Sequence, residues 1–240
     1  MIKVSDSTQK QQLVQTEGLT RFTGWLFEQV RPFLERGTVW EAGCGIGTYT
    51  QLLVAAGCER ILASDHDEDL LEIACRRFKG IEQGRLLTLD MSREEDFAKL
   101  RGESIRTIVC LNVVEHIEND LLVLRNMRAL LAPKGRLVLL VPAHPMLFNG
   151  IDREVHHCRR YTAFDLSEKL RMADFRLVRL YYFNAPGILG WFLYGHVLRR
   201  RRVPEMSVGL FDRLVPVFRW TERAILRGTL GISLIAICER

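Results

Sequence analysis

The sequence predicts an α/β fold, with a mostly parallel sheet that is covered by helices on both faces. Apolar runs with strand propensity alternate with amphipathic helical segments, and the connections between them are short. The composition is that of an ordinary globular protein, since 48% of the 240 residues are hydrophobic and 26% are charged. The length fits one α/β domain with an insertion, so we predict a single domain over residues 1–240.

The elements of the first part of the chain follow in order. Apolar residues at helical spacing predict a helix over 19–35. Three strands follow in TVWEA, ERILASD and RLLTLD, and the first of them leads through a glycine turn into a helix. The spacing of Ser92 and Glu95 is that of a capping box and predicts a short helix. The fourth and fifth strands are RTIVCLNVV and GRLVLLVPA, with a helix between them that runs to about Leu131.

After Pro145 the regular alternation of strands and helices changes. Thr162 is placed to cap a helix that ends near Ala173. Strand propensity returns in FRLVRLYYF and in the terminal GISLIAICE. Between these strands, residues 184–228 are rich in Trp, Leu, Arg and Pro and are predicted to be helical, as a lid or a crossover.

Charge is distributed unevenly along the chain. The formal net charge is +5, but residues 151–240 hold 16 basic and 9 acidic residues, and all but one of these basic residues are arginine. This part is therefore the expected face for an anionic partner.

The expected compartment is the reducing cytoplasm. The six cysteines are scattered without a Cys-x-x-Cys pair, and the first residues contain no apolar leader segment. Residues 180–198 carry no formal charge and are followed by Arg199–Arg202. Asn184, Pro186 and several glycines interrupt this stretch, which favours contact with the inner membrane face over a membrane span.

A glycine-rich turn follows the first strand, in Glu41-Ala-Gly43-Cys44-Gly45-Ile-Gly47. Glycines there let the backbone pass close under a ligand before a helix begins. A dinucleotide fingerprint needs its third glycine one residue later than Gly47. The carboxylate of Glu41 also disfavours a pyrophosphate and suits a ligand with a cationic amino-acid end.

Acidic residues end the second and third strands. Asp65 is placed to accept both hydroxyls of a ribose, and the acidic residues 67–69 are expected to cap the next helix. Asp90 ends the third strand in the same layer, with Met91 beside it. A carboxylate that accepts from an exocyclic amine, next to a soft apolar side chain, suits an adenine ring.

The ordered motifs EAGCGIG, SD, LD, CLNVVEHIEND and LLAPKGRLVLLVPA resemble those of the class I S-adenosylmethionine-dependent methyltransferases. The closest likeness is to the small-molecule branch that includes ubiquinone-biosynthesis-type enzymes, and it covers residues 20–183 and 230–239. The resemblance implies a Rossmann-like sheet of seven strands with an antiparallel last strand, which GISLIAICE supplies. It divides the domain into an N-terminal helical cover (1–36), a cofactor-binding core (37–145) and an acceptor-side region (146–240).

The resemblance also implies which residues bind S-adenosylmethionine. Glu41 and the glycines lie near its methionine part, Asp65 holds the ribose, Asp90 and Met91 hold the adenine, and Asn112 lines the site. The full implied set is Glu41, Gly43, Cys44, Gly45, Gly47, Asp65, His66, Asp90, Met91, Asn112, Val113 and His116.

A finer likeness concerns VPAHPMLFNGIDREVHHCRRYT and the segments that follow it. It is similar to bacterial methyltransferases associated with glycosyltransferases and with envelope or natural-product pathways. The expected acceptor is therefore a small molecule or a lipid- or sugar-linked compound, with O-methylation by in-line transfer.

A hydroxyl acceptor requires a general base. The candidates are Glu115, His116, His144, His156 and His157. We choose His144 first, because it follows strand five at the edge where acceptors meet the methyl group, and His157 second. Glu115 has an alternative role at a helix start, and His116 one in lining the cofactor site.

The segment Arg159-Arg160-Tyr161 is a candidate clamp for an anionic acceptor, since arginine suits carboxylate and phosphate. A solvated loop with one packed tyrosine explains it equally well. No metal is predicted, because the adjacent His156 and His157 have poor chelate geometry and no partner pair.

Nucleic acid is not an expected partner, because strand four ends in NVVE and no interleaved aromatic and basic residues follow. Two alternatives stay open: an NAD(P)-binding oxidoreductase and a non-catalytic module that binds a membrane surface. The sequence makes no prediction of oligomeric state.

Overall fold

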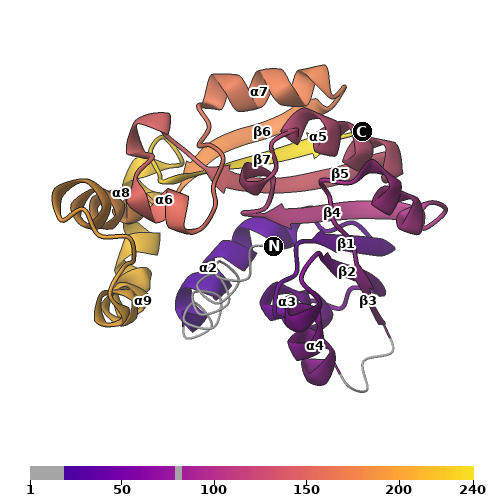
Figure 1. Cartoon of the computed structure of the whole chain (residues 1–240), viewed down its shortest axis with the longest axis horizontal. Coiled ribbons are helices and arrows are strands. Elements are labelled where there is room, and N and C mark those ends of the chain that lie inside the picture. Colours follow the sequence, from indigo (N-terminus) through magenta and orange to yellow (C-terminus); the bar gives the residue numbers. More distant parts are fainter. Residues whose placement is uncertain (1–18, 79–82) are drawn as a thin grey trace.

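The computed structural model describes residues 19–78 and 83–240, and these residues form one seven-stranded sheet. The strand order is β3-β2-β1-β4-β5-β7-β6 (Figure 1). All neighbouring pairs from β3 to β5 are parallel, and β7 runs antiparallel to both β5 and β6. The predicted antiparallel last strand is confirmed. The strands are β1 (Thr38–Ala42), β2 (Arg60–Asp65), β3 (Gly84–Thr88), β4 (Ile105–Leu111), β5 (Leu131–Pro142), β6 (Arg176–Phe183) and β7 (Ser233–Glu239).

Helices cover both faces of the sheet, as predicted. Figure 1 shows α5 and α7 on one face and α2, α3 and α4 on the other, while α6, α8 and α9 lie beyond one end of the strands. The helices are α2 (Thr20–Val30), α3 (Thr48–Ala55), α4 (Glu68–Arg77), α5 (Asp120–Leu130), α6 (Gly150–Glu154), α7 (Ala163–Met172), α8 (Pro186–Phe192) and α9 (Glu205–Thr221). The 3₁₀ helices are η1 (Arg31–Phe33), η2 (Glu94–Leu100), η3 (Val114–His116) and η4 (Pro145–Leu147), and the π-helical segments are η5 (Leu193–Val197) and η6 (Glu222–Leu226).

The core has two layers because side chains alternate along each strand. On β1, Trp40 packs into the layer under α5 and α7, whereas its neighbour Val39 packs into the layer with α2. Both side chains are fully buried. This alternation lets runs such as TVWEA be apolar throughout, as strands buried on both faces require.

Three predicted boundaries are wrong in detail. The first helix ends at Val30 and not near residue 35, because Pro32 follows and only the η1 turn continues. Ser92 does not cap η2; its hydroxyl donates to the Asp90 carboxylate at 2.7 Å, and Arg93 occupies the cap position. The helix after strand four is split, with α5 starting only at Asp120.

Residues 184–228 are mainly helical, as predicted, in α8, η5, α9 and η6. Of the apolar run 180–198, residues 180–183 belong to β6. No helix within the described part of the chain is long and apolar enough to cross a membrane.

Helix α9 is joined to α2, although about 190 residues separate them. The start of α2 has no side-chain cap of its own, and Asp212 of α9 accepts the backbone N–H of Phe22 at 2.9 Å. The rings of Phe22 and Phe211 lie 5.8 Å apart in an edge-to-face arrangement. Residues 184–228, which we call the lid after one of the two sequence predictions, are thus attached to the first described helix by both polar and apolar contacts. Residues 1–18 of the predicted N-terminal cover lie outside the described residues.

Candidate active site

The glycine turn after β1 is held by backbone contacts to the end of β2. The N–H groups of Gly43 and Cys44 both donate to the carbonyl of Ser64, at 2.8 and 2.9 Å. The N–H of Gly45 donates to the Asp65 carboxylate at 2.8 Å. The turn and the acidic end of β2 therefore form one unit at the carboxyl edge of the sheet, where ligands of open α/β sheets bind.

Two positions in this turn accept only glycine. Gly43 and Gly47 both have φ of +82°, a conformation that other residues adopt with strain. A Cβ on Gly43 would lie 2.4 Å from Val113, and one on Gly47 would lie 2.4 Å from Phe78. The glycines thus bring the turn against the β4 end and against α4.

Glu41 lies beneath this turn and is buried, with 4% of its surface exposed. Its carboxylate accepts a short hydrogen bond from the hydroxyl of Thr50. Burial raises the pKa of Glu41 to about 8, because the Thr50 hydrogen bond offsets only part of the desolvation. A cationic group placed beside this carboxylate would favour its ionised form.

This pKa predicts how stability changes with pH. The folded state keeps Glu41 protonated up to about pH 8, whereas its ordinary pKa is 4.5. The contribution of Glu41 to the free energy of unfolding is therefore complete below pH 4.5. It is lost as the pH rises from 4.5 through 8, by up to about 1.4 kcal/mol per pH unit. We expect Glu41→Gln, which does not titrate, to gain stability relative to the wild type over this range. Urea unfolding of both proteins at a series of pH values checks this, and a constant difference would contradict it.

Asp65 ends β2 and is almost completely buried. Burial raises the pKa of its carboxyl, but hydrogen bonds from His66 and from the N–H groups of Asp67 and Gly45 outweigh burial and lower it overall. The ring of His66 is exposed, with Nδ1 3.3 Å from the Asp65 carboxylate. Asp65 is thus held ionised and ready to accept further hydrogen bonds. Asp67 caps α4, as predicted.

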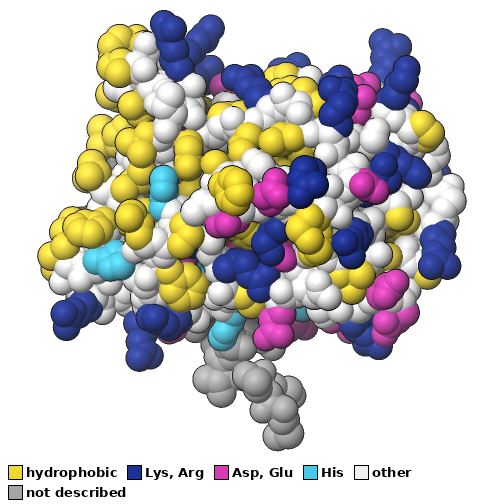
Figure 2. Space-filling view, turned by 90° about the horizontal axis from the view of Figure 1, so that it is seen from above, with side chains coloured by type: hydrophobic (Ala, Val, Ile, Leu, Met, Phe, Trp, Pro, Cys, Tyr) yellow, Lys and Arg dark blue, Asp and Glu magenta, His cyan; other side chains and the backbone are white. Residues whose placement is uncertain are grey.

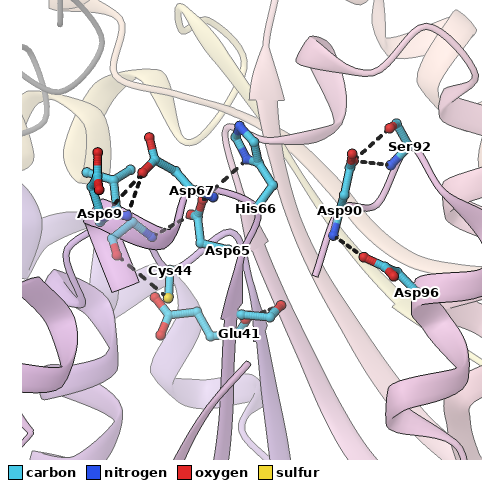
Figure 3. Close-up of polar contacts among 12 residues, drawn as sticks. Glu41, Cys44, Asp65, His66, Asp67, Asp69, Asp90, Ser92 and Asp96 are labelled. Carbon is cyan, nitrogen blue, oxygen red and sulfur yellow. Dashed lines mark hydrogen bonds and ion pairs between the residues drawn. The ribbon is translucent and has the colours of Figure 1, made fainter. Parts of the chain in front are cut away.

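Asp90 follows β3 in the same layer (Figure 3). Its carboxylate accepts from both the N–H and the hydroxyl of Ser92, and its own N–H donates to Asp96 at 2.8 Å. Met91 is buried beside it. The pair therefore offers a fixed polar acceptor next to an apolar side chain.

The acidic residues lie in one row because of the strand order β3-β2-β1-β4. Asp65 and Glu41 belong to β2 and β1, while Asp90 and Asn112 follow β3 and β4. Asn112 has φ of +55° and an exposed side chain, and its N–H donates to Leu140 at 2.9 Å. The structure thus brings the four polar positions predicted for cofactor binding to one edge of the sheet.

A second group of polar residues lies just beyond β4. One ligand-type atom from each of Glu115, His116 and His157 lies within 4.8 Å of the others. The Glu115 side chain is fully buried, and neither of its oxygens has a hydrogen-bond partner among the described residues. Burial raises the pKa of Glu115 to about 8, while burial, with a smaller electrostatic contribution from the neighbouring His157, lowers the pKa of His116 to about 4. We call these three residues the β4 cluster.

Asp152 supports the β4 cluster from α6. It accepts from His157 Nδ1 at 2.9 Å, from Arg160 at 2.7 Å, from Trp191 Nε1 at 3.1 Å and from the N–H of Asn149 at 3.0 Å. Burial raises the pKa of Asp152, but the hydrogen bonds from His157, Asn149 and Arg160 and the charge of Arg160 outweigh burial and lower the pKa overall. Because Trp191 belongs to α8, the lid is joined to the cluster through one carboxylate.

His144, the first candidate base, lies apart from these contacts. Its Nε2 is 2.9 Å from the carbonyl of Gly231, and its ring stacks on Tyr182 with centroids 5.1 Å apart. A carbonyl requires a donor, so Nε2 carries the proton and only Nδ1 is left to accept one.

The candidate anion clamp makes its polar contacts within the protein. Arg160 is buried against Asp152, with its guanidinium over the Trp191 ring at 4.8 Å. Arg159 pairs with Asp120 at 2.8 Å, and the Tyr161 hydroxyl donates to the same carboxylate at 2.8 Å. These contacts favour the structural role, and acceptor binding by the three residues stays a prediction.

Sequence reasoning missed Asp152 and Trp191. Asn149 and Asp152 have capping-box spacing, and the structure contains that capping box at the start of α6. The spacing indicates a cap and gives no sign that the same carboxylate also holds a histidine and an arginine.

The chain is similar to known methyltransferases. A family model described as a methyltransferase domain matches residues 17–180, which is more than half of the chain. The ubiquinone biosynthesis O-methyltransferase of Xanthomonas euvesicatoria is 28% identical over 101 residues. That match covers 42% of this chain and 41% of the relative, so the chain spans about two fifths of the length of that enzyme.

Solved structures share the fold at low sequence identity. An S-adenosylmethionine-dependent methyltransferase from Mesorhizobium loti has a TM-score of 0.62 and 14% identity, over 90% of this chain and 98% of that one. The N-methyltransferase NodS of Bradyrhizobium japonicum, solved with S-adenosylhomocysteine, has a TM-score of 0.51 and 16% identity, over 85% and 78%. From the family match, the ordered motifs and this sheet, we conclude that the chain belongs to the class I S-adenosylmethionine-dependent methyltransferases.

Proposed function

We propose that the protein transfers the methyl group of S-adenosylmethionine to a hydroxyl of a small-molecule acceptor that is lipid- or sugar-linked. The row of polar residues along the sheet supports the placement of the cofactor. Asp90 and Met91 hold the adenine, Asp65 the ribose hydroxyls, and Glu41 with the glycine turn the methionine part. The remaining predicted residues, Cys44, His66, Asn112, Val113 and His116, line this path.

The β4 cluster is the observation that carries O-methylation. Methyl transfer is an in-line displacement in which the enzyme mainly orients the reactants and excludes water. A hydroxyl must in addition lose a proton, and a positioned group that accepts it accelerates the step. Glu115, His116 and His157 place such groups beside the β4 end, where the methyl donor is expected.

Between the two candidate bases, the contacts favour His157. Its Nδ1 faces Asp152 at 2.9 Å, which leaves Nε2 toward Glu115 at 3.8 Å. A carboxylate on one ring nitrogen makes the other a better proton acceptor and fixes the ring. Nε2 of His144 is held by a backbone carbonyl, so His144 is the second candidate.

Transfer from S-adenosylmethionine with a ¹³C-labelled methyl group tests this proposal. The protein is incubated with bacterial lipid and polysaccharide-precursor extracts, and the labelled products are examined by NMR and mass spectrometry. A methoxyl carbon in the product supports the proposal. An N-methyl or C-methyl product overturns it, as does label found only in acceptors without a lipid or sugar part.

The lid supports an acceptor at a membrane surface. Exposed apolar side chains gather on α8, η5 and α9, and Figure 2 shows yellow side chains over this end of the molecule with basic side chains at its margins. They include Leu189, Phe192, Val197, Leu198, Met206, Leu210, Val217 and Trp220. A hollow of about 410 Å³ beside them is lined by Arg153, His196, Arg199 and Arg201, among others. Apolar and arginine side chains together suit anionic lipid or a phosphate-linked acceptor.

Changing Arg199–Arg202 to serine is expected to reduce binding to vesicles of phosphatidylglycerol by at least about tenfold, since each arginine near an anionic surface contributes about 1 kcal/mol. Co-sedimentation measures this, with neutral vesicles alongside. The matched control changes four exposed arginines elsewhere to serine, Arg76, Arg85, Arg93 and Arg101. Unchanged sedimentation of the Arg199–Arg202 variant would remove the membrane from the proposal.

The two other functions that the sequence left open do not agree with the methyltransferase family to which the chain belongs. An NAD(P)-binding oxidoreductase and a non-catalytic module both conflict with the match to a methyltransferase domain over residues 17–180.

A further inference from the structure

We propose that Glu115, His116 and His157 bind a divalent metal ion of the Zn²⁺ class, which holds the acceptor hydroxyl next to the methyl donor. The inference rests on the proposed O-methylation, because it assigns the ion a role toward a hydroxyl. The sequence predicted no metal from the neighbouring pair His156 and His157. In the structure only His157 of that pair lies near other candidate ligands, namely Glu115 and His116, which come about 40 positions earlier in the chain.

The first support is convergence. The ligand-type atoms of the β4 cluster lie within 4.8 Å of one another, and His157 Nε2 is 3.8 Å from Glu115 Oε1. The two imidazole rings meet edge to face, with centroids 4.8 Å apart. Zinc bonds to nitrogen and oxygen are about 2.0–2.2 Å long, so two donors at a tetrahedral angle on one ion lie about 3.4 Å apart. The separation of 3.8 Å is already close to this value, and closing a separation of 4.8 Å by about 1.4 Å through side-chain rotation would complete the site.

The second support is the state of Glu115. Its side chain is fully buried, and within residues 19–78 and 83–240 neither carboxylate oxygen has a hydrogen-bond partner. Leaving both oxygens of a buried carboxyl without a hydrogen bond is costly. A cation bound by this carboxylate and two neutral imidazoles would remove the cost.

The third support is the contact behind His157. Metal-binding histidines generally donate their second ring N–H to a carboxylate or carbonyl, which fixes the tautomer that leaves the other nitrogen free. His157 has this arrangement, with Nδ1 2.9 Å from Asp152. Asp152 is itself fixed by Arg160 and by Trp191 of the lid. The ring is therefore oriented toward Glu115 before any ligand binds.

The donor set defines the class of ion. One carboxylate and two imidazoles suit Zn²⁺, Co²⁺, Fe²⁺ or Mn²⁺ better than Ca²⁺ or Mg²⁺, which prefer oxygen. Three protein ligands leave at least one position for an acceptor oxygen. When bound, such an ion would lower the pKa of the hydroxyl that it holds. Nε2 of His157 would then be a ligand, so activation by the ion would take the place of proton acceptance by this nitrogen.

Binding of Co²⁺, a coloured substitute for Zn²⁺, tests the site without any assay of activity. The full chain is treated with chelator and titrated with Co²⁺, and visible absorption is recorded. We expect one ion per chain in the wild type. Glu115→Gln and His157→Asn are expected to weaken binding by at least about 100-fold. His156→Asn and Cys158→Ser are the matched controls and are expected to bind as the wild type does.

Affinity for S-adenosylhomocysteine, measured on the same samples, shows that each variant is folded. No saturable binding of Co²⁺ by the wild type, or binding that survives both Glu115→Gln and His157→Asn, overturns the site. Methyl transfer to a hydroxyl at full rate after chelation also overturns it but leaves O-methylation intact. Methyl transfer to nitrogen or carbon alone overturns the proposed function, while the Co²⁺ titration still decides whether the ion binds.

Discussion

Replacing Asp65 with alanine is expected to weaken the binding of S-adenosylhomocysteine by at least about 100-fold. The carboxylate is held ionised at the end of β2, where we propose that the ribose binds. A hydrogen bond to a charged group contributes about 1.5–3 kcal/mol, and two ribose hydroxyls are involved. The alanine also removes the acceptor of the Gly45 N–H, which fixes the glycine turn.

Calorimetric titration of S-adenosylhomocysteine measures this effect, with NAD as a ligand that should not bind. Glu68→Ala is the matched control, since Glu68 is an exposed acidic residue in the first turn of α4. Thermal unfolding of each variant separates lost affinity from lost folding. If Asp65→Ala binds within about threefold of the wild type, the ribose lies elsewhere.

Replacing Asp152 with alanine is expected to lower the free energy of unfolding by about 3–5 kcal/mol, which is large for a single substitution. Its side chain and that of Arg160 are at most 1% exposed, so the alanine leaves a buried guanidinium without its carboxylate. His157 and Trp191 lose their acceptor as well.

Urea unfolding at several pH values measures this effect and its origin. The pKa of Asp152 is lowered from 3.8, so its stabilisation is complete above that pH and is lost as the pH falls below it. The deficit of Asp152→Ala should therefore shrink in acid. A double variant, Asp152→Leu with Arg160→Met, should be less destabilised than the two single changes added together. Strict additivity would show that the two side chains do not depend on each other.

Much of the fold could be predicted because local pattern decides it. The apolar runs of β1, β2 and β4 are strands buried on both faces. Asp65 ends β2 and Asp90 follows β3, and the strand order brings both to one edge of the sheet. The predicted boundaries are wrong where a single contact decides the local structure. The Ser92 hydroxyl, for example, donates to Asp90 instead of capping η2.

The β4 cluster could not be predicted, because tertiary packing alone brings its members together. Glu115 at a helix start and His157 in an arginine-rich loop each have an ordinary local explanation. Their separation of 3.8 Å depends on where the loop after α6 crosses the end of β4. The same holds for Trp191, whose indole reaches Asp152 from the lid.

The hydrogen bond that the Phe22 N–H donates to Asp212 joins α9 of the lid to the start of α2, so the two helices are expected to move together. Swinging α9 outward alone would strip α2 of its cap and separate Phe22 from Phe211. Opening that preserves these contacts must carry α2 along, and α2 also contacts α3, the helix that begins directly after Gly47. An outward movement of α9 would therefore also displace the glycine turn, to which we assign the methyl donor.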